Sequence, residues 1–149
     1  MGVLLLISCL CVLSEEVDTF LDEYRFNGYT FQWSSGLYLS IGEPVTFLIY
    51  PRADLEGVLC GIGGEAILDL RLELLGGGVD IIDDNPDDLP VLHFTTGPFP
   101  VSYTVSVTAL DMLYGASADS VYVFCAMRPV KEELDILDPV EPDSAITGE

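Results

Sequence analysis

The feature that most limits what this chain can fold into is a regular alternation of apolar and polar side chains at every second position. It is plainest from Leu68 to Leu74, where leucines alternate with Asp69, Arg71 and Glu73. An α-helix would spread these leucines around its surface, whereas a β-strand places them all on one face of a sheet. This segment is therefore predicted to be a β-strand with one face in a hydrophobic core.

Similar runs recur between residues 28 and 127, separated by short stretches rich in Gly, Pro, Ser and Asp. Strands are expected over residues 29–33, 37–41, 45–50, 66–74, 79–82, 91–95, 101–109 and 120–127. Residues 52–64 are glycine-rich and irregular in pattern, and are predicted to be a loop. The glycines at 76–78 favour a hairpin turn, because glycine adopts positive φ at little cost. The spacing predicts an all-β fold, an antiparallel β-sandwich or jelly roll of about eight strands.

Composition narrows the class of partner. The chain has 149 residues and is 50% hydrophobic, which fits one domain with a substantial core. Five Lys and Arg residues against 25 Asp and Glu residues give a net charge of -20. Such a chain repels nucleic acid and anionic membrane surfaces, so the candidate ligands that remain are cations, basic partners and neutral polymers.

The first fourteen residues carry no charged side chain, and the first acidic residue is Glu15. The apolar run Val3–Leu13 has the length of a signal-peptide core and is too short to span a bilayer. We expect a signal peptide over residues 1–14, a sandwich domain over 15–130 and an acidic flexible tail over 131–149, in a secreted or cell-surface protein. A basic segment before the apolar run is missing, so two alternatives stay open: a lipoprotein signal at Cys9, and an uncleaved strand or anchor buried in a partner.

Two cysteines, Cys60 and Cys125, lie outside this N-terminal segment. A pair of cysteines in an exported protein favours a disulfide, which would close a loop of roughly 66 residues and stabilise the fold by about 4 kcal/mol. The alternative is two buried free thiols in a reducing compartment.

An acidic stretch stands out between residues 80 and 88. Hard cations such as Ca²⁺ bind several oxygen ligands, and carboxylates on one tight loop can supply them. The Gly and the distant Glu of an EF-hand are missing, and the alternative is a solvated hairpin end. The candidate metal ligands are Asp80, Asp83, Asp84, Asn85, Asp87 and Asp88.

Sequence signals for catalysis are weak. His93, the only histidine, shares a strand face with Val91 opposite Leu92 and Phe94, and is interpreted as a half-exposed strand residue. Neither a Gly-x-Ser-x-Gly nor a His-Glu-x-x-His motif occurs in the chain. The chain is therefore predicted not to be an enzyme.

Three aromatic residues, Tyr29, Phe31 and Trp33, alternate along one expected strand and are predicted to share a face. They are interpreted as core, with a platform for a sugar or polymer as the alternative. Tyr38 and Tyr50 are candidate exposed rings.

The segment from Asp69 to Ala109 has a recognisable order: an Asp-Leu-x-Leu-x-Leu strand, a glycine turn, an acidic strand end, and a strand with Tyr-x-Val-x-Val. In this order it resembles the bacterial pre-peptidase C-terminal domain, a β-sandwich appended to exported peptidases and other secreted proteins. Val101 stands where that family has a glycine, and the cysteine pair is not part of its general pattern. The matching positions are Asp69, Leu70, Leu72, Leu74, Gly76–Gly78, Asp83, Asp84, Tyr103, Val105 and Val107. The resemblance implies a non-catalytic accessory domain and identifies no ligand.

Taken together, these patterns favour a secreted binding or accessory module whose partner is an extracellular protein or a polysaccharide. The alternative is a structural subunit of an extracellular filament, coat or matrix that self-assembles through sheet edges or the N-terminal apolar segment. A small hydrolase is the third hypothesis. Calcium is the one cofactor that the acidic loop suggests.

Overall fold

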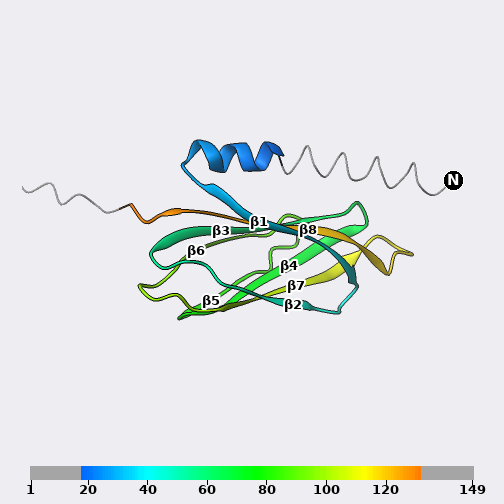
Figure 1. The fold of residues 1–149 in the computed structure, drawn as a ribbon. Coiled ribbons are helices and arrows are strands. Elements are labelled where there is room, and N and C mark those ends of the chain that lie inside the picture. The colour runs from blue at the N-terminus through cyan, green and yellow to red at the C-terminus, as the bar shows by residue number, and fades with distance from the viewer. Residues whose placement is uncertain (1–17, 132–149) are drawn as a thin grey trace, which may run out of the picture.

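The fold is an all-β sandwich, as the alternation predicts. The computed structural model describes residues 18–131. Two antiparallel sheets of four strands each pack face to face (Figure 1). Sheet A has the strand order β1-β8-β3-β6, and sheet B has the order β2-β7-β4-β5. The strands are β1 (Thr30–Ser40), β2 (Val45–Ile49), β3 (Leu55–Gly63), β4 (Ile67–Gly76), β5 (Val79–Asp83), β6 (Val91–Thr95), β7 (Tyr103–Met112) and β8 (Ala118–Pro129).

The strand order is that of a jelly roll. β1 pairs with β8, β2 with β7, β3 with β6 and β4 with β5, all antiparallel, so the chain folds as nested hairpins. Pairing of β8 with β3 and of β7 with β4 rolls these hairpins into two sheets. Strands β1 and β2 consequently form one pair of sheet edges, and β5 and β6 form the other.

The inner faces of the two sheets form the main core. Sheet B contributes alternate residues of β4 and β7, and sheet A contributes alternate residues of β8, as the period of two requires. Full burial of each of these side chains stabilises the fold by about 1.5–3 kcal/mol. The central members are Leu70, Leu72, Leu74, Val105, Val107, Val121, Val123 and Cys125, all at most 1% exposed.

The alternation in β4 breaks at its start. Leu68, predicted to face the core, is 46% exposed, whereas Ile67 is buried at 2%. The pairing of β4 with β7 shifts register between Ile67 and Asp69 and again between Asp69 and Leu70. A shift of one residue turns a side chain to the opposite face, so Ile67 takes the core position.

The glycine-rich segment predicted as a loop is instead the buried strand β3. Leu59 faces the main core, and Gly57, Gly61 and Gly63 occupy the same face at alternate positions. A Cβ atom on Gly61 would lie 3.1 Å from the Leu70 side chain. Glycine at this position leaves room for a side chain of the opposite sheet. The strand was not predicted because three of its core-facing positions are glycines, so the sequence shows no alternation of apolar and polar side chains.

Strand β1 is continuous through residues 34–36, where the sequence predicted a turn. A bulge between Phe31 and Trp33 shifts its pairing with β8. Phe31 pairs with Ala126 and is 37% exposed, whereas Trp33 pairs with Cys125 and packs against the main core. The prediction that Phe31 and Trp33 share a face was therefore wrong.

A short helix covers the outer face of sheet A. Residues 18–26 are helical and lie across this sheet outside the sandwich (Figure 1). Leu21, 5% exposed, packs with Cys60, Ile62 and Phe124, and Phe20 adds to this second cluster. No helix within residues 18–131 is long and apolar enough to cross a membrane.

The predicted Cys60–Cys125 disulfide was wrong, because both cysteines are free and buried. In the pairing of β3 with β8, Leu59 lies opposite Cys125 and Cys60 lies opposite Phe124. Cys125 therefore faces the main core, and Cys60 faces the helix on the other side of the same sheet. Burial raises the pKa of each thiol to about 12, with a smaller contribution from Asp83 at Cys60.

The predicted signal peptide over residues 1–14 lies outside the described residues, together with Cys9. The same holds for the predicted tail, of which only Lys131 is described.

Candidate functional site

An open groove lies at the sandwich edge formed by β1 and β2. It is a cavity of about 350 Å³ between the start of β1, the end of β2 and the segment that leads into β3. The β1 bulge sits at this point, and bulges commonly redirect a side chain beside a binding site. The lining residues are Gln32, Trp33, Leu48, Ile49, Tyr50, Pro51, Arg52, Leu55 and Met127.

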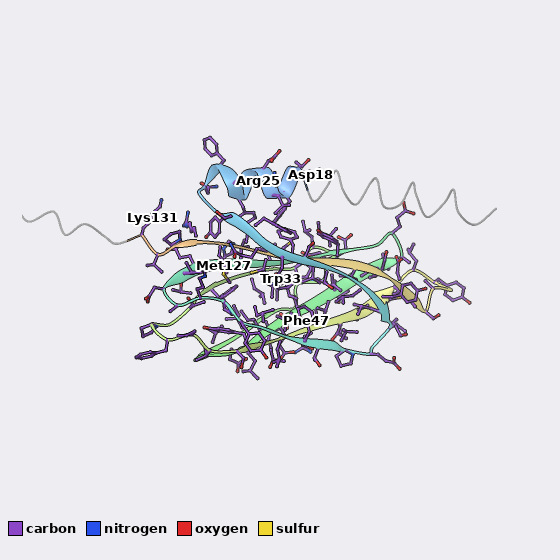
Figure 2. The ribbon with its side chains drawn as sticks, in the orientation of Figure 1. Asp18, Arg25, Trp33, Phe47, Met127 and Lys131 are labelled. Carbon is purple, nitrogen blue, oxygen red and sulfur yellow. The ribbon has the colours of Figure 1, made fainter. Side chains whose placement is uncertain are left out.

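Packing between the sheets fixes the position of Trp33. Its ring meets Phe47 of β2 edge to face, with centroids 5.5 Å apart and an interplanar angle of 85°. Figure 2 shows Trp33 in sheet A above Phe47 in sheet B. Such aromatic pairs add about 0.5–1.5 kcal/mol beyond their burial. Trp33 is therefore a rigid wall of the groove and remains partly exposed there.

Another part of the groove lining consists of the last residue of β2 and the residues that follow it. Ile49 is the last residue of β2 and is buried, at 6% exposed. Tyr50 comes next and is 74% exposed, and Pro51 has no N–H to continue the ladder. Arg52 follows and is also exposed. The Tyr-Pro-Arg sequence thus places an aromatic ring and a cation beside Trp33.

The groove carries a positive charge in a protein that is strongly acidic as a whole. Among the described residues that line it, Arg52 is the only charged one, although acidic residues outnumber basic ones 25 to 5 in the chain. Among residues 18–131, the ion pairs join Arg25 to Asp22 and Arg128 to Glu56, and Arg52 takes part in neither. Within the described part of the chain, no ion pair engages its guanidinium, which is available there for a ligand.

Gln32 supplies a second polar group. Its side-chain Nε2 donates a hydrogen bond to the carbonyl oxygen of Thr30 at 3.1 Å. This contact orients the amide and leaves the Oε1 acceptor without a partner among the described residues. The lining of the groove therefore includes donors on Arg52, an acceptor on Gln32 and the aromatic rings of Trp33 and Tyr50.

The sequence named Trp33 and Tyr50 as aromatic candidates but missed Arg52 and Gln32. The available signal was the Tyr50-Pro51-Arg52 triplet directly after an apolar strand. The two other platform candidates do not line the groove. Phe31 lies on the opposite face of β1 from Trp33, and the ring of Tyr29 contacts Tyr24 and has the Arg128 guanidinium stacked over it at 4.4 Å from the ring centroid.

The structure spreads out the residues predicted to bind a metal. Asp80 is exposed and pairs with Leu75, whereas Asp83 is half-buried and pairs with Leu72. Successive side chains of a strand alternate, so Asp80 lies on the outer face of sheet B and Asp83 on the inner side. The loop residues, all exposed, are Asp84, Asn85, Asp87 and Asp88.

Several oxygens of this loop are already used in structural hydrogen bonds. Asp83 accepts one from the Val91 N–H at 2.8 Å and one from the Asn85 side chain at 2.7 Å. Asp87 accepts one from the Leu89 N–H at 3.0 Å through its side chain. Within residues 18–131, no group of three or more His, Cys, Asp or Glu residues could hold a metal ion.

The sequence missed a carboxylate that is linked electrostatically to this loop. Asp69 on β4 pairs with Asp111 on β7. Desolvation raises the pKa of Asp69, and repulsion from Asp111, Asp87 and Asp84 raises it further. One oxygen of Asp69 is buried and finds no hydrogen-bond partner among the described residues.

His93 lies on the outer face of sheet A, as its alternation with Leu92 and Phe94 predicted. It is exposed, and its ring centroid is 6.1 Å from that of Tyr24 on the helix. With Glu56 and Tyr29 it borders a second, more open hollow of about 360 Å³.

No protein-family model matches the chain, and no curated protein matches it.

Proposed function

We propose that this protein is an exported, non-catalytic β-sandwich that binds an extracellular partner through the edge groove. The observation that carries the proposal is the groove itself, with Trp33, Tyr50 and Arg52 around one cavity of about 350 Å³. Ligand sites typically combine apolar and aromatic walls with a few placed polar groups. The groove has this composition.

The groove lining favours binding over catalysis. A hydrolase needs a nucleophile and a base, or an acid and a base, within reach of one substrate atom. Three described lining residues carry polar side-chain groups, namely Gln32, Arg52 and the hydroxyl of Tyr50, and the others are apolar or aromatic. Neither Gln nor Arg exchanges a proton near neutral pH, and the described lining offers no His, Cys, Asp or Glu as a partner for the Tyr50 hydroxyl, so we rank the small hydrolase last.

The resemblance of residues 69–109 to the pre-peptidase C-terminal domain supports the same role. That family is accessory and non-catalytic, and it accompanies exported proteins. The uncharged apolar segment at residues 1–14 supports export.

Intrinsic fluorescence tests the binding role directly, because Trp33 is the only tryptophan in the chain. The protein is titrated separately with the polysaccharide fraction and the protein fraction of the extracellular material of the producing cells. We expect one fraction to change the Trp33 emission saturably, and the double variant Tyr50→Ala/Arg52→Ala to lose the response. If neither fraction alters the emission, the groove is not a binding site.

A structural subunit is the second candidate, and the outer face of sheet B favours it. Leu48, Thr104 and Leu75 form one row across β2, β7 and β4, and the two leucines are 53% and 52% exposed. Ile82 of β5 is 42% exposed on the same face. Self-assembly through this face predicts that Leu48→Ser/Leu75→Ser lowers the mass measured by light scattering. A wild-type mass of one chain at all concentrations would exclude it.

A further inference from the structure

We propose that the groove binds a neutral polysaccharide chain, an inference that rests on the binding role proposed above. Three features of the groove argue for this occupant: its charge, its hydrogen-bonding groups and the backbone at its rim.

Charge disfavours both ionic classes of ligand. The net charge of -20 repels a polyanion as it approaches the molecule. Among the described residues that line the groove, Arg52 is the only charged one and repels a cation, and no carboxylate there would attract one. An uncharged ligand meets neither barrier.

The polar groups suit hydroxyls. Arginine presents several N–H donors and no acceptor, and the amide oxygen of glutamine accepts. A sugar hydroxyl donates one hydrogen bond and accepts others, so sugar hydroxyls can accept from Arg52 and donate to the Oε1 atom of Gln32. The rings of Trp33 and Tyr50 provide apolar contact for the C–H faces of a sugar ring.

The backbone at the rim disfavours a peptide. Peptides often bind by adding a strand to an exposed sheet edge. At this groove, the edge of β1 is interrupted by the bulge between Phe31 and Trp33, and β2 is followed by Pro51, which lacks a donor. Recognition consequently falls to side chains, which suits a saccharide better than an extended peptide.

The experiment is a Trp33 fluorescence titration of the full chain with cellohexaose, maltohexaose, N-acetylchitohexaose and the neutral polysaccharide fraction of the producing cells. Oligogalacturonate and the extracellular protein fraction form the comparison set. Tyr50→Ala and Arg52→Ala test the groove, and Tyr38→Ala and Arg25→Gln are controls, since Tyr38 is 72% exposed at the far end of β1 and Arg25 lies on the helix. Circular dichroism verifies that each variant is folded.

We expect at least one neutral saccharide to bind. Its affinity should be the same at about 50 and about 500 mM salt, because salt weakens only interactions between charges and an uncharged ligand makes none. Each groove variant should lose at least about tenfold in affinity, and each control should match the wild type. Binding of oligogalacturonate alone or of the protein fraction alone would overturn the neutral-saccharide inference while the binding role stands. Absence of any response would remove both.

Discussion

Glycine residues decide how closely side chains approach β3. Gly57 pairs with Phe94 on the neighbouring strand, and a Cβ atom at residue 57 would overlap the Phe94 ring. Gly36 on β1, in contrast, has no atom within 4 Å of the corresponding position. The two glycines therefore differ in packing although both lie within strands.

Gly57→Ala should destabilise the fold by about 1–3 kcal/mol, because the core must move to admit the methyl group. The matched variant Gly36→Ala should be neutral or more stable by up to about 1 kcal/mol, because alanine loses less conformational entropy in a strand. Urea denaturation measures both. Equal effects of the two substitutions would contradict the placement of Gly57 against Phe94.

Asp69 is the residue for which a pH effect is expected. Its pKa is raised in the folded state, so the charged form is destabilised there, and its contribution to stability falls as the pH rises through that pKa. Asp69→Asn should raise the melting temperature at pH 7 by about 1–4 °C, since like charges on paired strands cost about 0.2–1 kcal/mol. The gain should disappear at a pH below the pKa of unfolded Asp. A gain that is independent of pH would assign the effect to something other than this charge.

At the scale of elements, the sequence predicted a strand correctly where apolar and polar side chains alternate visibly along it. In β4, β7 and β8, nearly every second residue is apolar and faces the core, so the existence of these strands and the direction of their side chains were largely predictable. β3 was not, since Gly57, Gly61 and Gly63 leave its core face without side chains. The groove could not be predicted for a related reason. The bulge between Phe31 and Trp33 changes which face of the sheet the β1 side chains point to, and nothing in this sequence marks a bulge.

The helix at residues 18–26 is predicted to shield Cys60 on the outer face of sheet A from solvent. Leu21→Ala weakens the packing on Cys60, Ile62 and Phe124. Alkylation of Cys60 by iodoacetamide should accelerate by roughly tenfold through local opening of the helix, whereas Cys125 in the main core should stay protected. Peptide mass spectrometry quantifies each site.

The control for this experiment is Glu23→Ala, on the exposed side of the same helix. It should leave both alkylation rates unchanged. Parallel acceleration at Cys60 and Cys125 would mean that the substitution opens the whole sandwich rather than its cover. A Cys60–Cys125 linked peptide in the wild type would contradict the register of β3 with β8.

At the scale of the whole molecule, the charge of -20 makes stability sensitive to ions. The calcium hypothesis from the sequence stays a prediction, and the structure sharpens its test. Asp83 accepts the Val91 N–H, so replacing it would perturb the fold in the absence of calcium as well. Asp84, exposed in the loop, is the better probe.

If calcium binds the acidic loop, millimolar Ca²⁺ should raise the melting temperature by several degrees more than NaCl of equal ionic strength. Asp84→Asn should remove much of this excess, and Asp80→Asn, on the outer face of sheet B, should leave it intact. Matching shifts in Ca²⁺ and NaCl would show that ions only screen the charge.

The central claim is that the edge groove is the binding site, and chemical-shift mapping tests it most directly. The single tryptophan gives one indole N–H resonance in a proton–nitrogen correlation spectrum. On addition of the ligand fraction found by fluorescence, we predict shifts of the Trp33 indole and of the amides of Gln32, Ile49, Tyr50 and Arg52, while the amides of residues 84–89 stay in place. Shifts centred on His93 or on the outer face of sheet B, with the Trp33 indole unmoved, would contradict the account.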